Sequence, residues 1–399
     1  MFYNNELRKA GGKMKHYKSY KFRIYPSVEQ KLLINKTFGC TRFVYNYYLA
    51  KKKIVYSNRK ENLSCYDMCK DLSNLNKEYE FLKEVDSMSL RCSLFDLDDA
   101  YKSFYNKIHD YPKFKGKFTS KMSYRTNLIT STYKGREYQN IKVDLINNVV
   151  TLPKLKEIKI RGYRNLKQLP GRIINATISK EKDFRYYVSI LVEDMKEIFY
   201  QNPKSIIGID LGIKDLVITS DGKKFINNKV IEKYEKRIKR LQRRLSKKVK
   251  RSSNYQKTKI IIAALYRKIR NTRKYYLHSI SKELVTNNDI IVSENLNIKS
   301  MTDKKNHTLS KLIADASWYE LTRQIEYKSK LVGKKYIKVD TYYASSQICS
   351  VCGSKFKKVK DLNIRKWECP KCGTSHDRDI NASINIMFEG IKQYIQNLI

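Results

Sequence analysis

The sequence is short of acidic residues and histidines, and it contains no long hydrophobic run. No apolar stretch approaches the ~18 residues that a membrane-spanning helix requires, and the N-terminus lacks the apolar segment of a signal peptide. The 14 glycines form neither a GxxxxGK(S/T) nor a GxGxxG motif, so neither an ATP-driven motor nor a Rossmann dehydrogenase is indicated. The five histidines are scattered, without a paired motif for a metal site or a catalytic triad. Any hydrolytic chemistry must therefore come from carboxylates.

Positive charge is what the sequence has in excess. There are 83 lysines and arginines against 39 aspartates and glutamates, which gives a formal net charge of +44. So large a charge destabilises a compact fold by self-repulsion and indicates a polyanionic partner. The 41% of hydrophobic residues are too many for a disordered chain, and 399 residues suffice for two or three domains. We therefore expect a soluble intracellular protein that binds nucleic acid; a protein of the membrane surface is the weaker interpretation.

The N-terminal half changes its hydrophobic period twice. Residues 1–13 are polar and patternless, and we expect a disordered tail there. A short alternating strand then gives way to helical spacing, and later the pattern becomes that of strands again. We predict one small β-barrel made of residues 14–26 and 120–200, with a helical domain of residues 27–119 inserted in it.

The C-terminal half has the pattern of a sheet with helices between its strands. Apolar strands are predicted at residues 206–210, 215–219 and 289–293, and two amphipathic helices separate the second strand from the third. A cysteine-rich insert then precedes a last helix from about residue 381 to residue 398.

Four cysteines provide the strongest local motif. They are spaced Cys-x2-Cys-x16-Cys-x2-Cys with a glycine after each pair, and they are Cys349, Cys352, Cys369 and Cys372. This spacing presents four thiolates to one tetrahedral Zn²⁺, so we predict a closed, structural zinc site. Two disulfides are the alternative, which is disfavoured because nothing indicates secretion. The other cysteines show no such pairing and are predicted to be buried thiols, with a second metal site as the alternative; they are Cys40, Cys65, Cys69 and Cys92.

Three carboxylates occupy positions that an RNase H-like sheet would bring together. Asp210 ends an apolar strand, Glu294 follows the strand 290–293, and Asp379 enters the final helix. In such a sheet the ends of two central strands and one flanking helix converge, and three carboxylates there can hold two Mg²⁺ ions about 4 Å apart. Taken singly, Asp210 could be a turn residue and Glu294 a surface acid. Asp379, or its neighbour Asp377, could be a helix N-cap.

The segment 233–251 is a basic stretch, with 11 lysines and arginines against one glutamate. It is either the solvated face of a helix or a nucleic-acid surface, and the apolar stripe along it is compatible with both. Contacts to a phosphate backbone are independent of base sequence and weaken steeply with salt. The candidate contacts are Arg237, Arg240, Arg243 and Arg244.

Several segments together resemble the TnpB family, the transposon-encoded RNA-guided nucleases related to type V CRISPR effectors. Besides the cysteine motif, these segments are Tyr20–Pro26, Phe38–Asn46, Ser123–Asn127, Gly208–Gly212, Glu294–Leu296 and His376–Ala382. Members have a wedge β-barrel with an inserted helical recognition domain, followed by a RuvC-type RNase H fold that a zinc ribbon interrupts. The resemblance therefore implies an α/β plus β-barrel fold. It places the nuclease domain at residues 204–345 and 377–399 and the zinc ribbon at residues 346–376.

The resemblance also implies a function. The family's catalytic, Mg²⁺-binding trio falls on Asp210, Glu294 and Asp379, where the pattern is intact. The expected activity is that of an RNA-guided, Mg²⁺-dependent endonuclease that cuts double-stranded DNA beside a short transposon-associated motif. Thr126 and Asn127 are candidates to contact that motif. The expected partners are a guide RNA from the transposon end and the DNA target, in the bacterial cytoplasm and associated with the nucleoid.

Two functions of other classes are alternatives. A nuclease-inactive, RNA-guided DNA-binding repressor is disfavoured because the trio is intact. A transposase, or an accessory DNA-binding protein of transposition, shares the RNase H fold but needs no guide. An activity assay with Mg²⁺, performed with and without RNA, separates the three.

Overall fold

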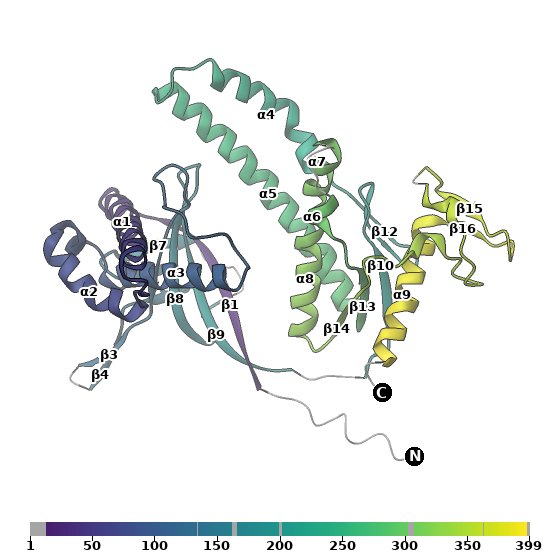
Figure 1. The fold of residues 1–399 in the computed structure, drawn as a ribbon, viewed down its shortest axis with the longest axis horizontal. Helices are drawn as coiled ribbons and strands as arrows, with labels where there is room; N and C mark the ends of the chain where they lie inside the picture. Colours follow the sequence, from purple (N-terminus) through teal and green to yellow (C-terminus); the bar gives the residue numbers. More distant parts are fainter. Residues whose placement is uncertain are drawn as a thin grey trace, which may run out of the picture. The chain divides into compact units, whose positions relative to one another are not determined.

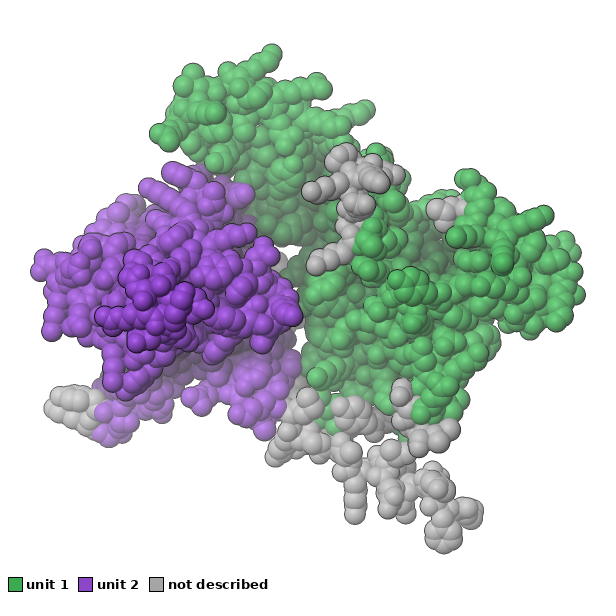
Figure 2. All heavy atoms as spheres, in the orientation of Figure 1, with its two compact units in different colours: residues 1–13, 197–399 green, residues 14–196 purple. Residues whose placement is uncertain are grey.

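The computed structural model describes residues 13–133, 135–161, 166–198, 202–301, 307–361 and 363–396. The chain divides into two compact units, drawn as ribbons in Figure 1 and coloured separately in Figure 2: an N-terminal unit of residues 14–196, and a C-terminal unit that contains residues 197–399. The tail expected at residues 1–13 lies outside the described residues, except for Lys13, which begins the first strand. In the described part of the chain, no helix is both long enough and apolar enough to cross a membrane.

The N-terminal unit contains a seven-stranded sheet with the strand order β2-β8-β9-β1-β7-β6-β5. Its strands are β1 (Lys13–Tyr25), β2 (Met122–Asn127), β5 (Lys142–Asp144), β6 (Val149–Leu152), β7 (Lys156–Arg161), β8 (Arg172–Lys180) and β9 (Tyr186–Glu197). A separate hairpin consists of β3 (Thr130–Tyr133) and β4 (Arg136–Gln139). Because β1 lies between β9 and β7, the first strand shares one sheet with the later strands, as the sequence predicts. Their inward-facing residues, such as Phe22, Ile158 and Val188, form one core.

Between β1 and β2 the chain is helical. Its helices are α1 (Val28–Arg59), α2 (Cys65–Glu78), the 3-10 helix η1 (Glu80–Glu84) and α3 (Ser87–Tyr105). Each α-helix begins after a side chain that accepts hydrogen bonds from its first turn: Ser27, Ser64 and Asp86. The helices pack around a core of their own, which includes Val44 and Leu94.

The C-terminal unit contains a mixed five-stranded sheet with the order β12-β11-β10-β13-β14. Its strands are β10 (Ile206–Asp210), β11 (Asp215–Thr219), β12 (Lys224–Ile226), β13 (Ile290–Glu294) and β14 (Lys335–Val339). Strand β10 is antiparallel to β11 and parallel to β13, and β13 is parallel to β14. Apolar cores lie on both faces of the sheet, which explains why β10 and β13 are continuous apolar runs in the sequence.

The helices of this unit are α4 (Val230–Ser246), α5 (Ser253–Asn287), α6 (Ile298–Met301), α7 (His307–Ala316), α8 (Trp318–Leu331) and α9 (Arg378–Gln396), with the 3-10 helices η2 (Ser345–Gln347) and η3 (Lys357–Lys360). Some of them cover both faces of the sheet. Helices α5 and α8 pack on one face, and α9 packs on the other (Figure 1). Helix α4 and the beginning of α5 form a hairpin held by apolar residues such as Ile238 and Leu265. The small hairpin of β15 (Lys366–Glu368) and β16 (Ser375–Asp377) leads directly into α9.

Two glycines let α9 approach the sheet closely. A Cβ atom on Gly208 of β10 would lie 2.0 Å from the Ser383 carbonyl oxygen of α9. A Cβ atom on Gly390 of α9 would lie 2.4 Å from the Val292 methyl carbons of β13. Both distances are far shorter than van der Waals contact, so a larger residue at either position would push the helix away from the strands.

Candidate functional site

Two of the three predicted carboxylates leave the same edge of the five-stranded sheet. Asp210 is the last residue of β10, and Glu294 is the last residue of β13. The two strands run parallel with Ile209 opposite Ser293, so the next residue of each strand emerges beside the other. The sheet therefore places Asp210 next to Glu294.

The third carboxylate belongs to the first turn of α9. Asp377 Oδ1 accepts hydrogen bonds from the backbone N–H groups of Asp379 (3.0 Å) and Ile380 (3.2 Å). Asp377 is therefore the N-cap of α9, and its Oδ2 pairs with Lys224 at 2.7 Å. The Asp379 carboxylate instead accepts hydrogen bonds from Arg365 Nη1 at 3.1 and 3.3 Å. Of the two acids that could have capped the helix, only Asp377 does so.

Glu294 and Asp379 both act electrostatically on Asp210. Removal of the Asp210 carboxylate from water, followed by the negative charges of Glu294 and Asp379, raises the pKa of Asp210 to about 8. Burial also raises the pKa of Glu294, and a hydrogen bond from the Ser345 hydroxyl opposes that shift. A cation placed beside Asp210 would offset the burial and the two negative charges that disfavour its ionisation.

The donor set fits a divalent cation. Carboxylate oxygens are the ligands that Mg²⁺ prefers, and here they come from two neighbouring strand ends and one helix. The acids are less tightly gathered than the cysteines, which alone among the described residues form a cluster with ligand atoms within 4.8 Å of one another. Arg365 contacts both oxygens of Asp379, so a bound cation would compete with it, whereas Ser345 contacts only one oxygen of Glu294.

The four predicted cysteine ligands converge. Cys349 Sγ lies 3.7 Å from Cys372 Sγ, and Cys352 Sγ lies 3.6 Å from Cys369 Sγ. A tetrahedral site with Zn–S bonds of about 2.3 Å has its sulfurs about 3.8 Å apart, whereas a disulfide brings them to about 2.05 Å. All four cysteines are free thiols, so the structure shows the dimensions of a metal site and not the alternative of two disulfides.

The two halves of this cluster share one backbone design. The Gly353 N–H donates to the Cys349 carbonyl oxygen, and the Gly373 N–H donates to the Cys369 carbonyl oxygen, each at 2.9 Å. Both glycines have positive φ angles, 71° and 69°, which other residues rarely adopt. This explains the glycine after each cysteine pair. His376 Nε2 lies 3.1 Å from Cys349 Sγ and adds a contact just ahead of α9.

The other four cysteines are only partly as predicted. Cys40 and Cys92 are buried, but Cys65 and Cys69 are partly exposed, one turn apart on α2. They pack against the edge of the helical core and line a groove that they share with Arg91 of α3. Among the described residues no third metal ligand joins them, so a second metal site is not supported.

The four candidate arginines of α4 are exposed. Within the described part of the chain, no carboxylate forms an ion pair with any of them. The nearby Glu235 is occupied, because it pairs with Lys239 and Lys311, each at 2.7 Å. The charges of these arginines are therefore available to a ligand.

Thr126 is not available for a direct nucleic-acid contact. Thr126 is only 1% exposed, and its hydroxyl donates a hydrogen bond to Asp86 Oδ2 at 2.7 Å. Since Asp86 also caps α3, Thr126 connects strand β2 to that helix. Buried and partly exposed positions alternate along the second half of β2, and the sequence motif does not show which face Thr126 occupies. Asn127, the next residue, is partly exposed and remains a candidate.

Three family models match parts of the chain. The one described as "Helix-turn-helix domain" matches residues 14–61, the one described as "Probable transposase" matches residues 189–305, and the one described as "Cas12f1-like, TNB domain" matches residues 318–386. In this structure the first match covers strand β1 and the single long helix α1. The third match contains the cysteine cluster and Asp379.

Two relatives match almost the whole chain. A Streptomyces pristinaespiralis protein that carries the name RNA-guided DNA endonuclease is 33% identical over 94% of this chain and 89% of its own. InsQ of Escherichia coli strain K12, which carries the same name, is 31% identical over 94% of this chain and 93% of its own. The fold is similar to that of the protein in a solved Cas12f1-sgRNA-target DNA complex, with a TM-score of 0.57 at 14% identity over 94% of this chain and 99% of that one. On these matches the chain belongs to the TnpB family.

Proposed function

We propose that this protein is an RNA-guided, Mg²⁺-dependent endonuclease of an insertion-sequence transposon, which cuts double-stranded DNA beside a short motif. The observation that carries the proposal is the meeting of Asp210 and Glu294 at one sheet edge, with Asp379 acting electrostatically on Asp210 from α9. The names of the two relatives support the same activity. A nuclease-inactive repressor is disfavoured because all three acids are present.

The two sheets support a division into domains. In the five-stranded sheet an antiparallel pair adjoins parallel strands, and α9 lies close against β10; this favours a RuvC-type nuclease domain of residues 204–345 and 377–399. The other proposed domains are a wedge β-barrel of residues 14–26 and 120–200, a helical recognition domain of residues 27–119, and a zinc ribbon of residues 346–376.

The residues around the three acids prepare them for catalysis. Asp210, Glu294 and Asp379 would hold Mg²⁺, which would supply an activated water for attack on the phosphodiester and stabilise the leaving oxygen. Asp210 must release its proton to serve as a ligand, and Ser345 orients Glu294. Asp379 lies in the first turn of α9, where the positive end of the helix dipole favours a negative charge. Arg365 pairs with Asp379 and balances its negative charge.

The remaining sites are proposed to bind zinc and nucleic acid. The four cysteines would hold one Zn²⁺ in a closed, structural site. The exposed arginines of α4 would contact the phosphate backbone of a guide RNA, which comes from the transposon end, or of the DNA target. Asn127 remains a candidate for contact with the flanking motif. This function places the protein in the bacterial cytoplasm, at the nucleoid.

The test combines RNA sequencing with a cleavage assay. Sequencing of the RNA that copurifies with the protein identifies the guide, and a plasmid library with randomised flanks supplies the target. We expect cleavage with Mg²⁺, and none with a chelator, without RNA, or for Asp210→Ala, which should still bind DNA. Binding without cleavage by the wild type would indicate a repressor. Strand joining without RNA would indicate a transposase.

A further inference from the structure

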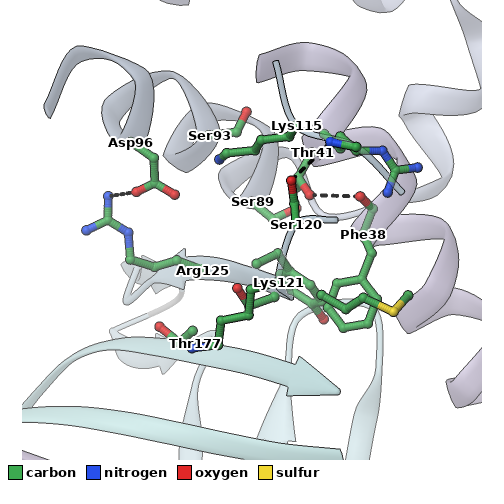
Figure 3. A pocket seen from close by; sticks show the side chains of 15 residues that line it. Phe38, Thr41, Ser89, Ser93, Asp96, Lys115, Ser120, Lys121, Arg125 and Thr177 are labelled. Atoms are coloured by element: carbon green, nitrogen blue, oxygen red, sulfur yellow. Dashed lines mark hydrogen bonds and ion pairs between the residues drawn. The ribbon is translucent and has the colours of Figure 1, made fainter. Parts of the chain in front are cut away.

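A cavity of about 520 Å³ lies within the N-terminal unit (Figure 3). Helices α1 and α3, strands β2 and β8 and the loop 115–121 form its walls, and many of its side chains carry hydroxyl groups. Its ionisable residues other than Tyr124 are one acid and four bases: Asp96, Arg42, Lys115, Lys121 and Arg125. We call it the Lys115 cavity.

The single acid is already neutralised. Asp96 Oδ1 accepts a hydrogen bond from Arg125 Nη2 at 2.8 Å, and Figure 3 shows the two side chains facing each other. The buried Nε of Arg125 has no hydrogen-bond partner among the described residues. Arg42, Lys115 and Lys121 form no ion pair with a carboxylate in the part of the chain that the structure describes. Four bases minus one acid leave the cavity with an excess of three positive charges.

Lys115 is held in place by its surroundings. Its backbone N–H donates to Asn46 Oδ1 at 2.8 Å, and its carbonyl oxygen accepts from Asn46 Nδ2 at 3.0 Å, which fixes the loop on α1. Its ammonium lies 3.6 Å from the centroid of the Tyr45 ring, a cation–π contact. Burial lowers the pKa of Lys115, so the fold keeps this cation where water solvates it poorly. An anion in the cavity would compensate that loss of solvation.

Two aromatic rings on the loop that carries Lys115 favour one kind of anion, although neither ring lines the cavity itself. On the same loop, Phe118 is 85% exposed and Phe114 is 55% exposed, and Lys117 lies over the Phe118 ring at 5.8 Å. Proteins that bind single strands commonly combine exposed aromatic rings, on which bases stack, with nearby cations that contact the phosphates. A free inorganic anion would fill little of the volume and would not use the rings, whereas a nucleic-acid strand uses both.

We propose that the Lys115 cavity binds a phosphodiester of a nucleic-acid strand. Arg42, Lys115 and Lys121 contact the phosphate, and Phe118 stacks on an adjacent base. The proposal rests on the proposed RNA-guided function, which it deepens by naming a backbone contact in the N-terminal unit. The strand is either the guide RNA or the DNA target, since both present the same phosphodiester.

The test compares Lys115→Gln with Lys113→Gln. Lys113 is nearby on the same stretch of chain, does not line the cavity and pairs with Asp110 at 3.4 Å, so its variant controls for the loss of one charge. One assay measures binding of labelled guide RNA to the protein, and a second measures binding of labelled target DNA to the protein–RNA complex, both over a range of salt. In whichever of the two assays measures the strand that the cavity binds, Lys115→Gln should weaken binding on the order of tenfold. It should also flatten the slope of log affinity against log salt by about 0.7 for a single strand or about 0.9 for a duplex.

Melting curves and a second variant exclude misfolding as the cause. Lys115→Gln removes a half-buried ammonium without a carboxylate partner but also its cation–π contact with Tyr45, so its melting temperature should stay close to that of the wild type. If it melts clearly lower, Arg42→Gln decides by the same measurements. Weaker binding of guide RNA would show that the strand in the cavity is the guide. Weaker binding of target DNA alone would show that it is the target. Normal binding in both arms by well-folded variants overturns the proposal. Cleavage by the wild type is scored separately, so a protein that binds but does not cut contradicts the proposed function, whereas the binding data alone decide whether the cavity holds a strand.

Discussion

Asp377 and Asp379 carry the same side chain two positions apart, and the structure gives them separate roles: Asp377 caps α9, whereas Asp379 faces Arg365. We expect Asp377→Ala to lower the free energy of unfolding by about 1 kcal/mol, the usual contribution of an N-cap, and to retain Mg²⁺-dependent cleavage. Asp379→Asn should abolish cleavage and leave the melting temperature close to that of the wild type. Melting curves and cleavage rates of the two variants check this. The reverse pattern would move the catalytic role to Asp377.

The raised pKa of Asp210 predicts a dependence of stability on pH. The folded, metal-free protein keeps this proton up to about pH 8, whereas an unfolded chain releases it at about pH 4. Asp210 therefore favours the folded state at low pH, and this contribution is lost as the pH rises from about 4 to about 8. Over that range the melting temperature of the metal-free wild type should fall relative to that of Asp210→Asn, which cannot ionise. Parallel melting curves would show that Asp210 ionises normally.

Among single residues, the sequence indicated which acids and cysteines gather in the fold, while the catalytic role of the acids stays a prediction. Acids at strand ends and cysteines in pairs have a recognisable setting. Arg365 and Ser345 have none, because each meets its acid only through the fold. The structure does not support Thr126 as a nucleic-acid contact, because a sequence motif gives the position of a residue along a strand but not the face of the sheet on which its side chain lies.

At the scale of elements, the sequence predicts where the strands lie better than it predicts which strands pair with one another. The strands predicted at 206–210 and 215–219 coincide with β10 and β11, and the strand at 289–293 is β13 shifted by one residue. Their apolar runs reflect burial on both faces. The order of the sheet was not predictable in this way, because the pairing of β10 with β13 depends on residues about 80 positions apart. The last helix begins three residues earlier than predicted, at Arg378, because the cap is Asp377.

The close packing of α9 on the sheet predicts opposite effects for two similar substitutions. Gly390→Ala places a Cβ atom 2.4 Å from Val292, so it should lower the free energy of unfolding by about 1–3 kcal/mol and displace α9 with its Asp379. Gly39→Ala in α1 is the control, since nothing lies within 4 Å of its Cβ atom. There the better helix propensity of alanine should stabilise the protein by up to about 1 kcal/mol. Chemical denaturation of both variants measures the difference, and equal effects would contradict the close approach.

The cysteine cluster connects metal content to the position of α9. Cys352→Ser removes one of the four sulfurs, so we expect less bound zinc and a ribbon that unfolds at lower temperature. Because β16 runs directly into α9, cleavage should fall together with the zinc content. Elemental analysis, melting curves and cleavage rates of the same preparation check this. A zinc-free variant that melts and cuts as the wild type does would show that the ribbon is dispensable.

At the scale of the whole molecule, the protein cannot balance its charge internally. Even if each of the 39 acids paired with one base, 83 − 39 = 44 positive charges would remain. Several acids are already used in pairs, as Glu235 is with two lysines. The excess charge is therefore exposed or, as at Lys115, enclosed without a carboxylate partner among the described residues. Binding of a polyanion relieves this repulsion, which is why the protein should be most stable with nucleic acid bound.

The arginines of α4 provide the last prediction, because they concentrate this charge on one helix. One variant replaces four arginines with glutamine, namely Arg237, Arg240, Arg243 and Arg244. It removes up to four phosphate contacts. The slope of log affinity against log salt should then flatten by about 3–4 units, and cleavage should fall at high salt and partly recover at low salt because the acids are untouched. A control variant replaces with glutamine four lysines that already pair with acids, namely Lys83, Lys113, Lys338 and Lys392. If both variants change the slope equally, net charge alone explains the binding; if only the arginine variant does, α4 contacts the nucleic acid.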